Sequence, residues 1–125
     1  MKVLTDTHAL VWALSDPDSL SATARRVLTE SEVAASVANL WELVIKTGKK
    51  DALLDDPIAW WEKYVVRSGI QTLSIRTAHV LTVGRLADIH KDPFDRILVA
   101  QALAEKLPLV SKDKLLGRYG VEVIW

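Results

Sequence analysis

Residues 3–14 read VLTDTHALVWAL and contain the first strand-to-helix unit of the chain. The apolar start leads into Asp6 and Thr7, residue types that favour helix N-termini, and residues 8–14 suit a short helix. The run Ser15-Asp16-Pro17-Asp18 is a turn signal that ends this helix. The stretch therefore predicts a strand, a turn and a helix, in that order.

The same alternation of strand and helix continues to the end of the chain. Further strands are predicted at residues 33–37, 70–75, 109–110 and 121–125. Further helices are predicted at residues 22–30, 38–47, 57–68, 77–86 and 94–106. Strands separated by helices pair in parallel through right-handed crossovers. The fold class is therefore expected to be α/β, with helices flanking a central parallel sheet of about five strands.

Cap residues mark the starts of several of these helices. Ser21 is expected to cap the helix that ends at residue 30. Asp56 and Asp92 each precede a proline, which is the preferred order of N-cap and first helical residue. In the 94–106 helix, one apolar face is formed by Ile97, Leu98, Gln101 and Ala102. This helix is the clearest element in the sequence.

The composition limits the classes of protein to consider. At 125 residues the chain has the size of one domain, so residues 1–125 are expected to form a single domain. No apolar run approaches the roughly 18 residues of a membrane span, and the N-terminus lacks the apolar stretch of a secretory signal. The protein is therefore expected in the cytoplasm, without a membrane partner.

The charges and the missing cysteines bear on the chemistry. Sixteen basic and sixteen acidic residues cancel, so the chain lacks the global positive field of many nucleic-acid binders. The absence of cysteine excludes disulfides, thiolate zinc sites and a cysteine nucleophile. Any metal chemistry must therefore use oxygen or histidine ligands.

Four acidic residues are predicted to lie near one edge of the sheet. Asp6 follows the first strand, and Asp113 follows the 109–110 strand. Glu42 lies in the helix after the second strand, and Asp95 lies in the first turn of the 94–106 helix. In parallel sheets, ligands bind outside the carboxyl ends of the strands. The four carboxylates are therefore candidates for one shared site.

Each aspartate also has a purely structural interpretation. Asp6 or Thr7 could cap the first helix, and Asp113 could cap the short segment that follows it. Asp92 is interpreted as a plain N-cap, which Asp95 could complete as a capping-box-like pair. A shared acidic pocket is preferred only because four separate capping accidents at one sheet edge are less plausible together.

Glu42 is harder to explain as a structural residue. It interrupts a helix of otherwise nearly all apolar residues, and such a helix is expected to be buried all round. A buried carboxylate needs a partner, because leaving it unpaired costs several kcal/mol or shifts its pKa. Two partners are open at this point: a metal ion, or the side chain of Lys46 one turn further along the helix.

Crowded carboxylates repel one another, and a divalent cation relieves that repulsion. Oxygen ligands without cysteine or paired histidines favour Mg²⁺, with Mn²⁺ as the alternative. A hard cation on carboxylates binds phosphate oxygens, lowers the pKa of a bound water and stabilises in-line displacement at phosphorus. The pattern therefore favours phosphodiester hydrolysis.

Nearly the whole chain resembles the PIN-domain ribonucleases, and in particular the VapC-like toxins of bacterial toxin–antitoxin pairs. The matching segments are Leu4-Thr5-Asp6-Thr7-His8-Ala9-Leu10, residues 36–42, His90-Lys91-Asp92-Pro93-Phe94-Asp95-Arg96, Leu109-Val110-Ser111-Lys112-Asp113 and Tyr119-Gly120-Val121. Each segment is short, but their order and spacing together are specific. The resemblance implies a PIN-like three-layer sandwich.

The resemblance also implies the roles of particular residues. Its acidic quartet would be Asp6, Glu42, Asp95 and Asp113. Among these, Asp6 and Asp95 would bind Mg²⁺ directly, while the other two would shape the pocket through waters or a second ion. The residues assigned to the substrate side are Thr7, Arg96 and Ser111. A hydroxyl of Thr7 or Ser111 would orient a carboxylate or a water, and Arg96 would reach a substrate phosphate or pair with Asp92.

For the activity, the resemblance implies endonucleolytic cleavage of RNA, a homodimer, and inhibition by a small cognate antitoxin that covers the site. Trp60 and Trp61 are left open between a partner surface and the core, because neighbours on a helix point about 100° apart. An RNA path near the acids could be lined by Lys46, Lys49, Lys50, Lys91, Arg96, Lys112 and Lys114, although solvated charges are the default interpretation.

Two other classes of protein remain as alternatives. A phosphoryl-accepting, receiver-like signalling domain is an α/β fold of similar length, but it needs an acceptor aspartate at the end of a central strand. The 70–75 strand ends without an acid, and Asp6 has a threonine on either side in place of an acid pair. The second alternative is a non-catalytic binding module whose acids only cap helices.

Overall fold

The central sheet of the computed structural model, which describes residues 1–125, is wholly parallel. Its strands are β1 (Lys2–Thr5), β2 (Glu32–Ser36), β3 (Gln71–Leu73), β4 (Leu109–Val110) and β5 (Val123–Ile124). They are arranged in the order β3-β2-β1-β4-β5, which makes β1 the middle strand. The five-stranded parallel sheet expected from the sequence is confirmed.

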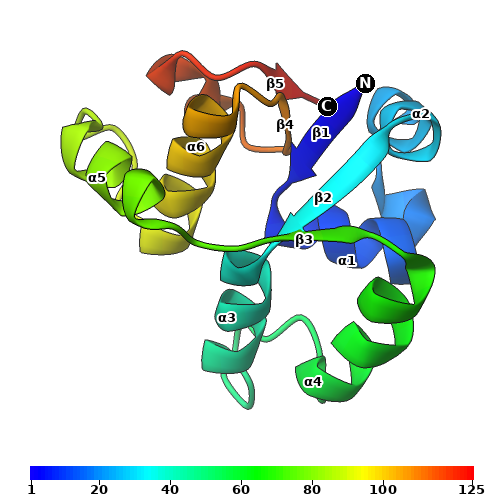
Figure 1. Cartoon of the computed structure of the whole chain (residues 1–125). Helices are drawn as coiled ribbons and strands as arrows, with labels where there is room; N and C mark the ends of the chain where they lie inside the picture. Colours follow the sequence, from blue (N-terminus) through cyan, green and yellow to red (C-terminus); the bar gives the residue numbers. More distant parts are fainter.

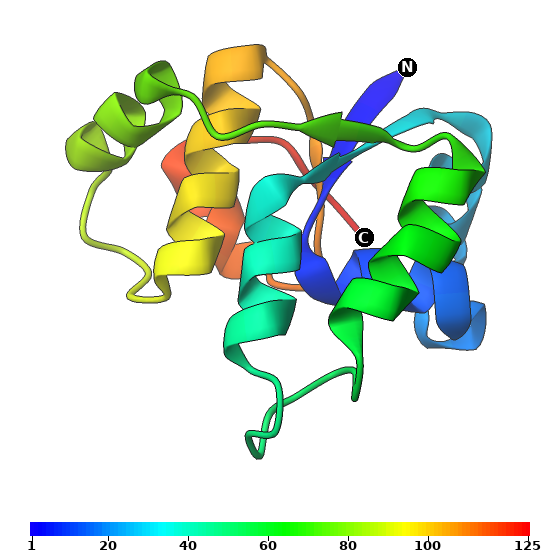
Figure 2. The ribbon, with the colours of Figure 1, turned by 60° about the horizontal axis from the view of Figure 1, so that its bottom comes forward.

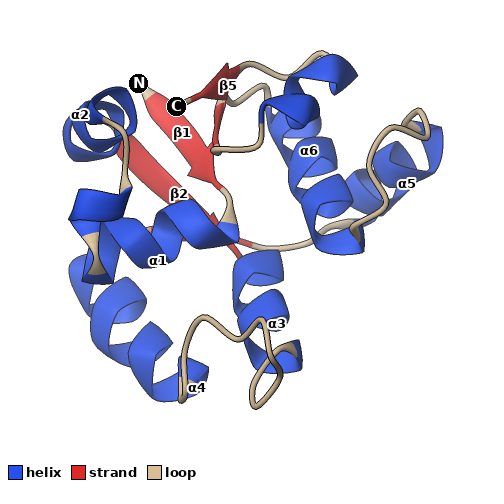
Figure 3. Cartoon of the chain, turned by 180° about the vertical axis from the view of Figure 1, so that it is seen from behind, coloured by secondary structure: helices blue, strands red, loops and turns tan.

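Helices lie on both faces of this sheet (Figures 1 and 3). The α-helices are α1 (Thr7–Ser15), α2 (Ala22–Glu30), α3 (Val37–Ile45), α4 (Pro57–Trp60), α5 (Thr77–Arg85) and α6 (Pro93–Glu105). Three short segments complete the list: the 3₁₀ turns η1 (Pro17–Ser19) and η3 (Lys114–Tyr119), and the π-helical η2 (Trp61–Val66). No helix is both long and apolar enough to cross a membrane.

The predicted strands at residues 70–75 and 121–125 are longer than the observed β3 and β5. Both are edge strands, and each pairs with a single neighbour. Since β4 has only two residues, β5 pairs with it over two positions. The ladder ends where the partner strand ends, so apolar residues beyond it pack without extending the sheet.

Alternate residues of the strands face the two helix layers. On one face Leu4, Ala34 and Leu109 pack with residues of α6. On the other face Val3 and Val110 pack with α1 and α2. This alternation is what the period of two along a strand requires. The three-layer α/β sandwich is therefore confirmed, with a core on each side of the sheet.

The predicted caps are found at the helix starts. Asp6, Ser21, Asp56 and Asp92 each accept a hydrogen bond from a backbone amide in the first turn of the helix that follows. At the end of β2, Ser36 forms a capping box with Asn39. Because each cap fixes where a strand gives way to a helix, the carboxyl ends of β1 and β2 are sharply defined.

The expectation that the 38–47 helix is buried all round is wrong. The observed α3 buries Glu42 and Leu43, while Trp41, Val44 and Ile45 are about half exposed. Figure 2 shows α3 standing beyond the sheet, between α6 and α4, so neighbours cover only part of its surface. An apolar helix here therefore has one buried face and one apolar face open to solvent.

Both tryptophans of the Trp60-Trp61 pair are in the core. They are more than nine-tenths buried, in a cluster with Leu10, Leu43 and Val65. Trp60 Nε1 also donates a hydrogen bond to Ser15 Oγ at 2.7 Å. The pair lies at the junction of α4 and η2, where the i→i+5 bonding widens the turn. The core interpretation is therefore correct for both residues.

Candidate metal centre

Asp6 connects the end of β1 to the start of α1. Its Oδ1 accepts the Ala9 amide at 2.8 Å, and its Oδ2 accepts the Ser111 hydroxyl at 2.5 Å. Burial raises the pKa of Asp6, against the lowering effect of those two donors, and the charge of Glu42 adds to the rise. Asp6 is therefore both a helix cap and a buried, oriented carboxylate, and a bound cation would stabilise its charged form.

Glu42 is held by two side chains. Its Oε1 accepts the Thr7 hydroxyl at 2.5 Å, and its Oε2 accepts Lys46 Nζ at 2.6 Å. Asn39 Nδ2 donates to the Thr7 hydroxyl at 3.1 Å and so directs the Thr7 proton to Glu42. Burial acts to lower the pKa of Lys46, but its hydrogen bond to Glu42 and the nearby acids outweigh burial and raise it. Lys46 is thus a structural partner of Glu42.

Asp95 has a strongly raised pKa. Burial is the main cause that raises its pKa from 3.8 to about 7, and the charges of Asp92, Asp6 and Glu42 add to the effect while His90 opposes it. These couplings mean that Asp95 lies within electrostatic range of three other acids. The site therefore concentrates negative charge around one poorly solvated carboxyl group.

Asp95 does not complete a capping box with Asp92. Asp92 caps α6 by accepting the Phe94 amide at 2.8 Å, but its own amide donates to His90 Nδ1 at 3.1 Å. The amide that a capping box would present to Asp95 is therefore already bound. The structural interpretation of Asp95 is thus wrong in this respect, whereas that of Asp92 is right.

Asp113 lies at the start of η3, after β4. Its Oδ1 accepts the Leu115 amide at 3.0 Å, and its Oδ2 lies 3.0 Å from His90 Nε2. The Asp113 amide donates to Ser111 Oγ at 3.1 Å, and that hydroxyl donates to Asp6. Ser111 therefore connects Asp6 to Asp113, because β1 and β4 are adjacent strands.

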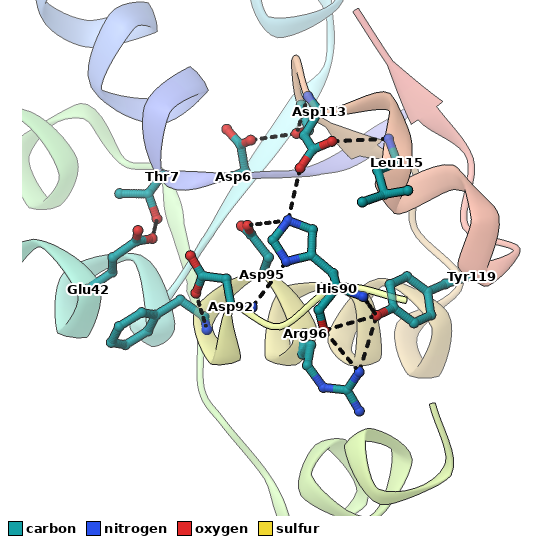
Figure 4. A network of polar contacts seen from close by, with 12 residues as sticks. Asp6, Thr7, Glu42, His90, Asp92, Asp95, Arg96, Asp113, Leu115 and Tyr119 are labelled. Carbon is teal, nitrogen blue, oxygen red and sulfur yellow. Dashed lines mark hydrogen bonds and ion pairs between the residues drawn. The ribbon is translucent and has the colours of Figure 1, made fainter. Parts of the chain in front are cut away.

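Sequence reasoning missed His90 as a residue of the site. Its Nε2 lies 3.0 Å from Asp113 Oδ2 and 3.4 Å from Asp95 Oδ2, and Figure 4 shows the ring between the two carboxylates. The three ligand-type atoms lie within 4.8 Å of one another. The only signal in the sequence for His90 is its place two residues before the N-cap Asp92. No sequence pattern predicts its contact with Asp113.

The residues assigned to the substrate side have structural contacts. Thr7 and Ser111 are buried and donate to Glu42 and Asp6, so each orients a carboxylate as expected. The Arg96 guanidinium does not pair with Asp92. It donates to the carbonyls of Val83, Ala87 and His90 and to the Tyr119 hydroxyl. A contact of any of the three with substrate stays a prediction, and the burial of the two hydroxyls speaks against it.

The donor set suits a hard divalent cation. The structure brings the four acids together from the starts of α1, α6 and η3 and the second turn of α3. All offer carboxylate oxygens, which Mg²⁺ and Mn²⁺ prefer. The pKa values of Asp6 and Asp95 are raised chiefly by burial, so the ionised forms of both carboxylates are poorly solvated. A cation bound to these oxygens would stabilise the ionised forms.

A parallel sheet with acids gathered at the carboxyl ends of β1 and β4 defines an α/β protein with a candidate centre for a hard cation. The model of the PIN domain family matches residues 3–122, and the chain belongs to this family. The family expected from the sequence is therefore confirmed.

Named relatives agree with this assignment. The chain is 28% identical over 116 residues to Ribonuclease VapC22 of Mycobacterium tuberculosis. The aligned residues make up 91% of this chain and 88% of that protein. It also resembles the DNA-bound VapBC structure of Salmonella typhimurium, with a TM-score of 0.72 and 20% identity over 98% of this chain and 96% of that chain. For VapBC2 of Rickettsia felis, bound to a promoter DNA fragment, the TM-score is 0.70 and the sequence identity is 17%. That match covers 98% of this chain and 97% of the other chain. At these identities the two structures show the fold alone.

Proposed function

We propose that this chain is a Mg²⁺-dependent endoribonuclease, with Mn²⁺ as the alternative ion, and the toxin of a toxin–antitoxin pair. The observation that carries the proposal is the chain of contacts that joins Asp6, Asp113 and Asp95 through Ser111 and His90 at one sheet edge. Asp95, whose pKa is about 7, lies within the electrostatic range of Glu42 as well. Membership of the PIN domain family and the relative named a ribonuclease support it.

Asp6 and Asp95 would hold the cation. When bound there, a divalent ion supplies a Lewis acid for a phosphate oxygen and a water of lowered pKa. Ser111 keeps one Asp6 oxygen turned into the site, because its hydroxyl donates to Oδ2. Since Glu42 is already paired with the ammonium of Lys46, it would act through its charge on Asp95. Asp113 would complete the acidic wall on the η3 side.

The path of RNA to the acids would use basic side chains that are free of other contacts. Two of the seven candidates are engaged inside the protein: Lys46 by Glu42, and Arg96 by backbone carbonyls. The exposed candidates are Lys49, Lys50, Lys91, Lys112 and Lys114. With the acids neutralised by the bound cation, these exposed lysines would bind RNA phosphates even though the net charge of the protein is zero.

The proposed partners are a cognate antitoxin and a second copy of this chain. A similar solved structure, from Klebsiella pneumoniae, is a toxin–antitoxin complex, which supports the antitoxin. For the homodimer, the exposed apolar face of α3, formed by Trp41, Val44 and Ile45, is a surface that a second copy would cover. The cytoplasmic location expected from the sequence stays a prediction.

The first experiment is cleavage of RNA by the purified chain. We expect Mg²⁺ or Mn²⁺ to support cleavage, a chelator to abolish it, and Asp6→Asn or Asp95→Asn to reduce it at least about 100-fold, which exceeds the loss typical of outer-shell partners. Asp55→Asn is the matched control, because Asp55 is exposed and its side chain makes no hydrogen bond or ion pair. Cleavage that persists with chelator would overturn the metal mechanism.

The same preparation separates the alternatives. A loss in Asp92→Ala equal to that in Asp95→Asn would mean that the ligand is misassigned within the first turn of α6. A signalling domain would take a phosphoryl group from a small donor onto one aspartate and leave RNA intact. A binding module would do neither. A short upstream reading frame for a DNA-binding antitoxin would support the toxin assignment.

A further inference from the structure

We propose that His90 is a positioning residue of the acidic centre. It carries its proton on Nε2, donates that proton to Asp113 beside Asp95, and does not itself bind the metal ion. The inference rests on the proposed function for its consequence, but the tautomer and the hydrogen bond can be measured on the metal-free chain. No pattern in the sequence points to this role.

The first step is the partner of Nδ1. The Asp92 amide donates to His90 Nδ1 at 3.1 Å. A ring nitrogen can accept a hydrogen bond only through its lone pair, so Nδ1 carries no proton while this contact is made. The Asp92 amide makes no other hydrogen bond. The backbone at the start of α6 therefore selects the tautomer with hydrogen on Nε2.

The second step is what Nε2 faces. It lies 3.0 Å from Asp113 Oδ2 and 3.4 Å from Asp95 Oδ2, both of which are acceptors. An N–H between two carboxylate oxygens satisfies the donor and reduces the repulsion between the acids. His90 thereby joins the start of α6 to the start of η3, which are two separate elements of the fold.

The same distances could suggest a metal site made of His90, Asp95 and Asp113. The tautomer argues against it, because a nitrogen that carries a proton has no lone pair for a metal ion. Coordination through Nε2 would move the proton to Nδ1, where it would face the N–H of Asp92. His90 therefore lies between two acids as a donor and leaves their remaining oxygens for the cation.

The backbone of His90 is held as firmly as its ring. Its amide donates to Tyr119 Oη at 2.7 Å, and its carbonyl accepts Arg96 Nη1 at 3.3 Å. Arg96 Nη1 also donates to Tyr119 Oη at 3.1 Å, which closes the network in Figure 4. Arg96 and Tyr119 thus fix the loop that presents the ring. The function of Arg96 in this arrangement is to position His90.

Three substitutions separate the two ring nitrogens. His90→Asn keeps an acceptor near Nδ1 for the Asp92 amide but is too short to reach Asp113. His90→Gln keeps an amide donor near Nε2. His90→Ala removes both. Unfolding curves of all three show whether the fold survives, and His90→Asn keeps the contact at the start of α6 in any case.

The first measurement is a long-range proton–nitrogen NMR correlation on ¹⁵N-histidine protein without metal, at mildly alkaline pH. The chain has three histidines, so the His90 signals are those missing in His90→Asn. We expect the pattern of a neutral ring with hydrogen on Nε2. A ring with hydrogen on Nδ1 would overturn the proposal.

The second measurement is Mn²⁺ binding, by calorimetry and by electron spin echo spectroscopy. We expect His90→Ala and His90→Asn to weaken binding about 10- to 100-fold, the usual effect of losing an outer-shell partner. His90→Gln should stay closer to the unsubstituted chain, and the echo should show no directly bonded ring nitrogen. A bonded nitrogen, or equal weakening in all three variants, would reject the donor role.

Failure of the proposed function looks different. If the unsubstituted chain binds Mn²⁺ and shows the expected tautomer but leaves RNA intact, the nuclease assignment fails and the role of His90 stands. If it binds no Mn²⁺ at all, the metal centre is wrong, and the positioning role falls with it.

Discussion

At the scale of single residues, Asp95 links acidity to stability. Its pKa is about 7 in the folded chain and 3.8 as an ordinary aspartate, chiefly because it is buried. The folded state therefore binds a proton more tightly than the unfolded state. This contribution to stability is complete below about pH 4 and is lost as the pH rises through 7.

The Asp95→Asn variant tests this linkage. Asparagine keeps the shape without the charge, so the metal-free variant should unfold at a higher urea concentration than the unsubstituted chain above about pH 7. We expect a gain of about 1–3 kcal/mol, less than the roughly 4 kcal/mol that a shift of three pKa units could supply, because Asp95 is still partly solvated. The gain should disappear near pH 4, and Asp55→Asn should show none at either pH. A gain independent of pH would contradict the burial argument.

A second residue-scale prediction concerns Lys46. Its ammonium is the partner of Glu42 Oε2, and the carboxylate is almost fully buried. Lys46→Met removes the charge but keeps the length, so it should lower the free energy of unfolding by about 1–3 kcal/mol at neutral pH, since Lys46 is partly exposed. Chemical denaturation measures this. Lys49→Met is the control, and equal stability of both variants would mean that Glu42 does not depend on Lys46.

At the scale of elements, α3 has two distinct faces. The face with Glu42 and Leu43 is covered by the rest of the chain, while Trp41, Val44 and Ile45 remain open to solvent. The sequence pattern alone suggested complete burial, because an apolar helix is usually surrounded. The proposed homodimer therefore rests on this exposed face of α3.

The double variant Val44→Asp/Ile45→Lys tests the proposed homodimer. Both side chains are exposed, so the fold should persist while self-association is lost, since charges on an apolar interface oppose its burial. Light scattering after gel filtration should report a dimer for the unsubstituted chain and a monomer for the variant. Ile58→Asp, at another exposed apolar position, should remain a dimer. A monomeric unsubstituted chain would contradict the proposal.

At the scale of the whole molecule, the proposed metal centre would couple folding to metal binding. Asp6 and Asp95 come from elements on the two faces of the sheet, α1 and α6, so their oxygens meet only in the folded chain. A cation that binds only the folded state stabilises it by mass action. Unfolding would separate Asp6 from Asp95, so the unfolded chain would lose the proposed binding site.

Thermal unfolding with and without metal tests this coupling. At about pH 8, Mg²⁺ or Mn²⁺ at a hundredfold excess over its Kd should stabilise the chain by about 3 kcal/mol. At about pH 5 the effect should be much smaller, because a protonated Asp95 competes with the cation. Stabilisation that is equal at both pH values, or that survives in Asp6→Asn with Asp95→Asn, would place the cation elsewhere.

Most of the fold, and the placement of the four acids near one sheet edge, could be predicted from the sequence by itself. The periodicity of strands and helices depends on residues at most four positions apart. The same is true of N-caps such as Asp6 and Asp92 and of the Glu42–Lys46 pair. The rule that parallel strands end at one edge then placed the acids together.

Only the tertiary structure decided how those acids are held. Ser111 reaches Asp6 across 105 positions because β4 lies beside β1, and His90 reaches Asp113 across 23 positions because its loop is tied to Tyr119. The exposed face of α3 likewise depends on which neighbours leave it uncovered. Such contacts follow from the order of strands and the packing of distant segments, and local sequence patterns do not encode them. Asp6 was visible as an acid at a strand end; its oriented, buried state required the folded chain.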